Sequence, residues 1–318
     1  ILKTSNGGAT WSTLLSGTTS SINSVYFTDT ITGFTVGNSG IILKTTDGGL
    51  TFDWSNNEGG NSIFFVNSLF GFLIPEASGK LFKTVDGGES WTTISITSWD
   101  LNTIWFISPE IGFVAGDKIY KTIDGGETWN AFTLGVWSDF NKIFFVNSSV
   151  GYLVNEANEI LKTIDCGKSW FYVKGGTCDL YDVFFVDSYH GYATGSHHIT
   201  KVTEDGGNTW KSYYSESFDW GHSLFFTSPS IGYVLENKFV FKTEDGGKTW
   251  QYIYMSGQGR LYGFYFIDEY TGFTVGEIGF MAKTTDQGLT WTQVATGTSE
   301  NLSSISFSDA SNGIAVGV

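Results

Sequence analysis

The sequence predicts an all-β fold, a single β-propeller built from four-stranded antiparallel blades, and three observations support it. A self-similar unit recurs with a period of about 40 residues, a spacing typical of propeller blades or helical solenoids. Its segments are short, rich in β-branched and aromatic residues and separated by Gly-containing turns, which favours strands over helices. Aromatic residues make up 17% of the 318 residues, enough to fill sheet faces that stack on one another. The unit ends at Trp11, Phe52, Trp91, Trp129, Trp170, Trp210, Trp250 and Trp291.

Each unit is expected to contain four strands in a fixed order. In the first complete unit they fall at residues 25–27, 33–36 and 41–45, with a fourth strand that starts near residue 51. Four short antiparallel strands per unit, arranged radially, make one propeller blade. Because neighbouring blades then bury both faces of each sheet, the eight aromatic positions are expected to form a ring of anchors between blades.

The two ends of the chain complement each other. Residues 1–15 carry the third and fourth strands of a unit, and residues 301–318 carry the first and second. The simplest closure is a single domain, 1–318, with eight blades, of which one is completed by both termini so that no sheet edge is left open. Seven blades plus a partial repeat, or a window cut from a longer array, are the alternatives.

A turn motif marks the boundary between the third and fourth strands of every unit. In Thr45-x-Asp47-x-Gly49-x-Thr51-Phe52, the Asp carboxylate can accept backbone N–H bonds, the Gly can take positive φ, and the aromatic ring packs inward. The motif therefore predicts a structural role for its Asp residues rather than a chemical one. These are Asp47, Asp86, Asp124, Asp165, Asp205, Asp245 and Asp286.

This motif resembles the Asp-box, or BNR, repeat of sialidases, sortilin-type receptors, xyloglucanases and photosystem II stability factors. The longer sequence pattern from Gly33 to Asp47 is most similar to the repeat of the photosystem II stability-factor subgroup. The resemblance implies a propeller and, as one possible function, a photosystem II-type assembly factor. That subgroup carries Arg at the start of the innermost strand. The equivalent column here reads Asn23, Asn61, Asn102, Asn141, Tyr181, His222, Tyr262 and Ser303.

Composition excludes several function classes. Seventeen Lys and Arg stand against 32 Asp and Glu, a net charge of −15, which argues against a nucleic-acid or anionic-membrane partner. No apolar run reaches the roughly 18 residues that a membrane-spanning segment needs. Sialidases hold their substrate carboxylate with three Arg, whereas Arg260 is the single Arg here, so sialidase activity is excluded. No residue spacing indicates a metal or cofactor.

Candidate binding residues lie in loops that should open onto one face of the ring. Large aromatic side chains alternate there with acids, the composition of a protein or carbohydrate interface. The candidates are Trp99, Asp100, Trp137, Asp139, Tyr181, Asp219, Trp220, His222, Arg260 and Tyr262.

The sequence thus predicts a non-catalytic binding or scaffold module for a protein or glycan, with an undetermined oligomeric state. A glycan-active enzyme, using Tyr262 and His222 as acid and base beside Arg260, is the first alternative. The photosystem II-type assembly factor is the second. Richness in Thr, Ser, Asn and Gly favours an extracellular or cell-surface location, with the periplasm as a further option.

Overall fold

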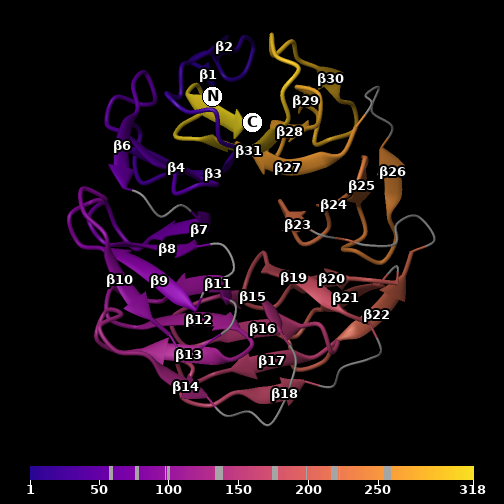
Figure 1. Ribbon diagram of the computed structural model, residues 1–318. Helices are drawn as coiled ribbons and strands as arrows, with labels where there is room; N and C mark the ends of the chain where they lie inside the picture. The colour runs from indigo at the N-terminus through magenta and orange to yellow at the C-terminus, as the bar shows by residue number, and fades with distance from the viewer. Residues whose placement is uncertain are drawn as a thin grey trace.

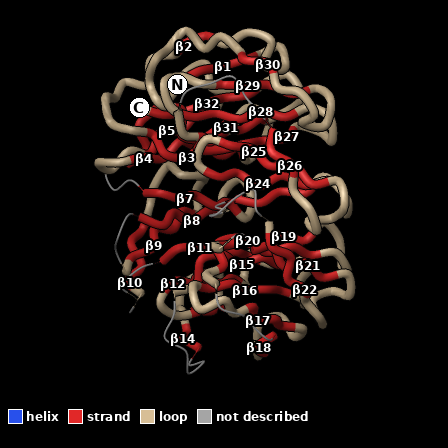
Figure 2. Tube along the Cα trace, turned by 90° about the vertical axis from the view of Figure 1, so that its right-hand side faces the viewer, coloured by secondary structure: helices blue, strands red, loops and turns tan. Residues whose placement is uncertain are grey.

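The computed structural model describes the chain except for residues 57–59, 76–78, 97, 99–100, 133–138, 174–177, 198, 216–220, 222 and 254–258. Eight sheets of four antiparallel strands stand in a ring (Figure 1). This arrangement confirms the prediction of an eight-bladed propeller. The described residues form strands and connecting loops (Figure 2), and they contain no helix long and apolar enough to cross a membrane.

The first two strands of each blade line and surround the axis of the ring. The innermost strands are β3 (Ile22–Phe27), β7 (Gly60–Phe65), β11 (Leu101–Phe106), β15 (Phe140–Phe145), β19 (Leu180–Phe185), β23 (Ser223–Phe226), β27 (Leu261–Phe266) and β31 (Leu302–Phe307). The second strands are β4 (Gly33–Gly37), β8 (Gly71–Pro75), β12 (Gly112–Gly116), β16 (Gly151–Asn155), β20 (Gly191–Gly195), β24 (Gly232–Glu236), β28 (Gly272–Gly276) and β32 (Gly313–Gly317).

The remaining two strands of each blade lie further out. The third strands are β5 (Ile42–Thr45), β9 (Lys80–Thr84), β13 (Ile119–Thr122), β17 (Ile160–Thr163), β21 (Ile199–Thr203), β25 (Phe239–Thr243), β29 (Met281–Thr284) and β1 (Leu2–Thr4). The outer strands are β6 (Asp53–Asn56), β10 (Thr92–Ser95), β14 (Asn130–Phe132), β18 (Phe171–Val173), β22 (Lys211–Tyr214), β26 (Gln251–Ile253), β30 (Thr292–Gln293) and β2 (Ser12–Thr13).

The innermost strands begin earlier than predicted. Strand β3 starts at Ile22 rather than residue 25, because the pairing with β4 shifts by one residue between Ile22 and Ser24. Such a β-bulge interrupts the alternation of apolar and polar side chains, so the sequence pattern reveals the strand only beyond it. The same shift recurs in β7, β11, β15, β19, β27 and β31.

Aromatic side chains join each blade to the one before it. The Trp129 ring meets Phe72 of the preceding blade and Phe106 of its own edge-on, with centroid distances of 6.2 and 6.1 Å. Phe72 and Phe106 stack on each other at 4.5 Å. Edge-on and offset-stacked rings are the favoured aromatic geometries. Each such group of three rings therefore buries the interface between two blades.

The two termini complete one blade, as predicted. The order of strands in this sheet is β2-β1-β32-β31, and the register pairs Leu2 with Ala315 and Thr4 with Gly313. The two ends of the chain lie side by side in both views (Figures 1 and 2). The Lys283 amine, from the neighbouring blade, donates a 2.7 Å hydrogen bond to the carbonyl of Gly7. Because β1 pairs with β32, the blade where the two ends of the chain meet has no open sheet edge between them.

The predicted turn motif is held together by hydrogen bonds to its Asp and Thr side chains. At Asp124, Oδ1 accepts from the Thr128 amide at 2.9 Å, and Oδ2 accepts from the Thr128 hydroxyl at 2.6 Å. The Thr122 hydroxyl donates to Asp124 Oδ1 at 2.7 Å and accepts from the Gly126 amide at 2.7 Å. These donors, above all Thr128, lower the pKa of Asp124 to about 2, since they favour the ionised carboxylate.

We expect the propeller to lose stability as the pH falls from about 4 toward 2. The pKa values of Asp86, Asp124, Asp165 and Asp205 are each lowered from 3.8 to about 2 in the folded chain. A pKa that is lower in the folded state stabilises the protein above 3.8, and that contribution disappears as the group is protonated. Thermal unfolding midpoints measured across this range should fall steeply, and a variant with Asp124→Asn should show a shallower fall. An equal slope in both proteins would contradict the assignment.

Candidate binding site at the mouth of the axial channel

The residues at the bulges form a polar ring where the innermost strands begin. In the seven strands with a described bulge, the extra residue is the second residue of the strand, such as Asn23 in β3 and Asn102 in β11. A bulge re-aims the side chain that it carries. The Asn102 amide group donates to the carbonyl of Phe140 at 3.1 Å, and that of Asn141 donates to the carbonyl of Leu180 at 2.8 Å. Each of these Asn side chains therefore ties its blade to the next one around the ring.

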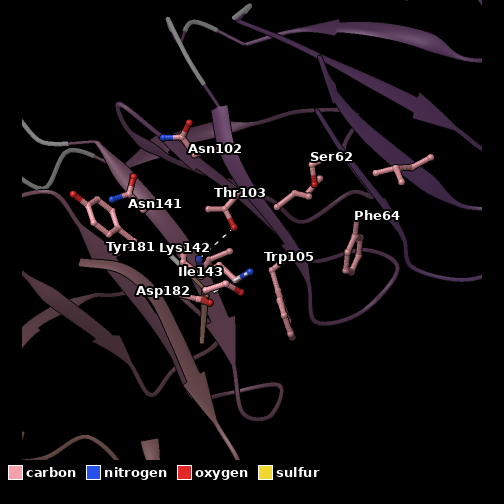
Figure 3. Close-up of a pocket in the computed structure, with 13 residues that line it drawn as sticks. Ser62, Phe64, Asn102, Thr103, Trp105, Asn141, Lys142, Ile143, Tyr181 and Asp182 are labelled. Carbon is pink, nitrogen blue, oxygen red and sulfur yellow. Dashed lines mark hydrogen bonds and ion pairs between the residues drawn. The ribbon is translucent and has the colours of Figure 1, made fainter. Parts of the chain in front are cut away.

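A cavity of about 390 Å³ lies in the channel beside this ring. Five successive innermost strands, from β7 to β23, contribute its walls (Figure 3). In the close-up, Asn102, Asn141 and Tyr181 lie at one end, whereas Phe64 and Trp105 lie at the other (Figure 3). The lining residues are Ser62, Ile63, Phe64, Asn102, Thr103, Ile104, Trp105, Asn141, Lys142, Ile143, Tyr181, Asp182 and Ser223.

One ion pair lies between the two ends of this cavity. Lys142 Nζ is 3.9 Å from Asp182 Oδ1, and the Lys142 side chain is 45% exposed. Asp182 is fixed by the amides of Val183 and Leu224, both at 2.9 Å, so it also links β19 to β23. Burial raises the pKa of Asp182, and the Lys142 charge opposes that rise. At 3.9 Å, Lys142 Nζ is beyond hydrogen-bond distance of Asp182 Oδ1, so the amine can offer its N–H groups to a ligand.

The far end of the channel has an aromatic wall. Rings from successive blades contact one another in a series, with centroid distances of 6.4 Å for Phe64 and Trp105, and 5.3 Å for Trp105 and Phe144. The series continues through Phe184 at 5.6 Å and Phe225 at 5.4 Å. The five rings are only partly buried, and two of them, Phe64 and Trp105, line the cavity. The lining of the cavity therefore changes from polar side chains at one end, past the ion pair, to aromatic side chains at the other (Figure 3).

Acidic side chains surround Tyr181 at the polar end. Burial raises the pKa of Tyr181, and the negative charges of Asp179 and Glu156 raise it further. Burial also raises the pKa of Glu156, as do the charges of Asp139 and Asp179. Tyr181 is thus held as a neutral phenol that can donate or accept a hydrogen bond. Of the predicted candidates, Asp139 and Tyr181 belong to this group.

Arg260 and Tyr262 form a separate group on the same face. Glu277 accepts hydrogen bonds from the Tyr262 hydroxyl at 2.9 Å and from the Arg260 amide at 2.8 Å. Burial and the bond to Glu277 raise the pKa of Tyr262. The raised pKa keeps Tyr262 as the neutral phenol, and its hydroxyl already donates to Glu277.

The other predicted site residues, Trp99, Asp100, Trp137, Asp219, Trp220 and His222, lie outside the described residues. Sequence analysis missed Lys142, Asp182 and the aromatic wall. The sequence did carry a signal for the ion pair. Lys142 and Asp182 stand at equivalent positions of neighbouring units, where the other units carry Ser, Thr or Gly. Among the residues that the structure describes, no group of three His, Cys, Asp or Glu side chains is placed to hold a metal ion.

Solved structures with the same architecture include YCF48 and a GH74 enzyme. YCF48 bound to a D1 peptide matches with a TM-score of 0.63 and 18% identity, over 80% of this chain and 89% of that chain. YCF48 from Cyanidioschyzon merolae matches with a TM-score of 0.64 and 17% identity, over 87% and 98%. The GH74 enzyme of Niastella koreensis matches with a TM-score of 0.54 and 15% identity, over 92% and 69%.

These likenesses show the fold. At such low identities they support a β-propeller and carry no function across by themselves. No family model and no curated protein matches the chain.

Proposed function

We propose that this propeller is a non-catalytic binding module that holds a polypeptide segment of a partner protein at the polar mouth of the channel. The observation that carries the proposal is the cavity between β7 and β23, whose volume of about 390 Å³ falls within the range of ligand sites. Of the predicted residues, Tyr181 lines the cavity, and the charge of Asp139 acts on the neighbouring Glu156. We further propose that the module acts outside the cell or at its surface.

The chemistry of the cavity suits a peptide. Hydroxyl groups of Ser62 and Ser223 and the amide groups of Asn102 and Asn141 line it, and such groups bond with peptide N–H and C=O groups. Trp105 and Phe64 offer apolar surface for a side chain of the partner. YCF48 has been solved with a D1 peptide bound, which supports a peptide as the kind of ligand that a propeller of this architecture can hold.

A photosystem II-type assembly factor is the second candidate. The sequence pattern of the repeat and the structural likeness to YCF48 favour this role. The Asn and Tyr side chains in the column where that subgroup carries Arg do not supply its positive charge. Purified protein used as bait on detergent extracts of photosynthetic membranes would retain reaction-centre subunits if this role is correct. Failure to retain them would remove it.

Peptide selection tests the proposed site directly. Random peptides selected on the immobilised protein should bind about tenfold more weakly to the Tyr181→Ala and Lys142→Ala variants, because each removes a contact at the mouth. Fluorescence anisotropy with each selected peptide measures the change. Glu204→Thr is the matched control, since it alters a remote turn at a position where Thr46 and Thr285 occur in other blades.

Three outcomes would contradict the proposal. Selected peptides that bind all variants equally would place their site away from the channel mouth. Retention of the protein on a polysaccharide panel, lost in Tyr181→Ala, would assign this face to a glycan instead. Release of new sugar ends from the panel would show an enzyme.

A further inference from the structure

The face opposite the channel mouth carries an unusual row of exposed apolar side chains. In each blade, one residue lies between the Thr and the Asp of the turn motif, and it points outward in all eight blades. Val85, Ile123 and Ile164 occupy this position in three successive blades and are 63%, 66% and 57% exposed. We name these three residues the Val/Ile row.

The fold does not require apolar side chains in this row. The other five blades carry Ser5, Thr46, Glu204, Glu244 and Thr285 at the same position. All five are exposed and belong to turns with the same hydrogen bonds from Thr to Asp or Asn. The repeat itself therefore shows that polar residues satisfy the turn. Apolar residues concentrated in adjacent blades indicate a surface that another molecule covers.

The adjoining turns extend the apolar surface toward the rim of the channel. Leu69, in the turn between β7 and β8, is 59% exposed, and its carbonyl accepts from the Gly87 amide of the same blade at 2.8 Å. Phe70 packs close to Gly125, which lies two residues after Ile123 in the following blade. A Cβ built on Gly125 would lie 3.5 Å from the Phe70 ring. Leu69 therefore adds exposed apolar surface beside the turn that carries Val85, and Phe70 packs toward the turn that carries Ile123.

The charges around the Val/Ile row are mainly negative. Asp86, Asp124 and Asp165 follow its residues directly in sequence, and Glu110 lies in the turn that bonds to Gly125. Two of the nearby cations are occupied, and a third, Lys168, is exposed in the turn that carries Ile164. The Lys83 amine is paired with Glu127, and the Lys121 amine donates to the carbonyl of Cys166 at 2.7 Å. The exposed surface is thus apolar with an acidic border.

We propose that the Val/Ile row docks a basic amphipathic segment of another protein, at a site separate from the channel mouth. Charge complementarity selects this occupant. A second copy of the chain carries the same net charge of −15 and would repel the acidic border, and so would an anionic membrane. Lys and Arg side chains of the segment meet the carboxylates, while its apolar face covers Val85, Ile123 and Ile164. This inference does not depend on the proposed peptide site.

Binding of a synthetic peptide tests the proposal. The probe is an amphipathic helix with Leu along one face and Lys along the other, compared with a scrambled peptide of the same composition. Fluorescence anisotropy should show that the combined Val85→Thr, Ile123→Thr and Ile164→Thr variant binds the probe about tenfold more weakly than the unmodified chain. Because Thr occurs naturally at this position in two other blades, the variant should retain its thermal unfolding midpoint.

Controls separate this site from general charge attraction and from the channel. Glu204→Thr with Glu244→Thr removes two acids from the same position in other blades and should leave affinity for the probe unchanged. The δ1 methyl signals of Ile123 and Ile164 should shift when the probe is added in an NMR titration. Unchanged methyl signals, or equal affinity of the triple variant, would overturn the proposal. Loss of probe binding in Tyr181→Ala would also overturn it, because the peptide would then occupy the channel.

Discussion

Replacing Gly88 by Ala is expected to lower the free energy of unfolding by about 3 to 5 kcal/mol. Gly88 has a φ of +82°, and a Cβ there would lie 2.5 Å from Cε1 of Phe34 in the preceding blade. Phe34 is fully buried and stacks on Phe65 with centroids 4.3 Å apart, so its ring cannot move aside. The substitution therefore adds backbone strain to a collision at the interface between two blades. Urea unfolding followed by Trp fluorescence measures the loss.

Gly297 provides the matched control for this prediction. Its φ is +72°, but no atom lies within 4 Å of a Cβ built there. Gly297→Ala should therefore cost only the backbone strain, roughly 1 to 2 kcal/mol. If both substitutions lower stability equally, the close approach of the turn to the preceding blade contributes nothing.

Removal of residues 1–15 is expected to destabilise the whole ring, by about 5 kcal/mol or more. The deletion takes away β1 and β2, exposes the edge of β32, and uncovers the rings of Phe273 and Phe307. Trp11 meets those rings edge-on at 6.2 and 6.0 Å, and Leu2 is 2% exposed in the same core cluster. An uncovered edge strand also promotes association between chains. Thermal unfolding and light scattering report the two effects.

A synthetic peptide of residues 1–15 should reverse these effects. Added in excess, it can pair with β32 in the register that joins Leu2 to Ala315, because strand addition restores the missing hydrogen bonds. Recovery of the unfolding midpoint would show that closure of the ring, and not a loss of chain length, accounts for the change. A truncated chain with an unchanged midpoint would mean that the seam does not hold the propeller together.

Much of the fold could be predicted because the signals are local and repeated eight times. The period and the complementary ends favoured eight blades with a split closing blade, and the structure has that arrangement. The boundaries of the innermost strands could not be predicted, since the bulge at positions such as Asn23 and Asn102 breaks the alternation on which strand assignment depends. The sequence identified the equivalent residues at this position, but it did not show in which direction their side chains point.

The sequence by itself determined the repeat period, the complementary ends and the turn motif, because each depends on residues within one unit or on the order of units. The structure decided for eight blades closed by both termini over the alternatives that the sequence left open. Only the tertiary structure decided that Lys142 lies beside Asp182, and that five rings from Phe64 to Phe225 make one continuous wall. These residues are about one repeat apart in sequence, and their contacts depend on how strands of different blades align. A shift of one residue in register turns a side chain to the opposite face of a strand, so composition and spacing do not specify what lines the channel.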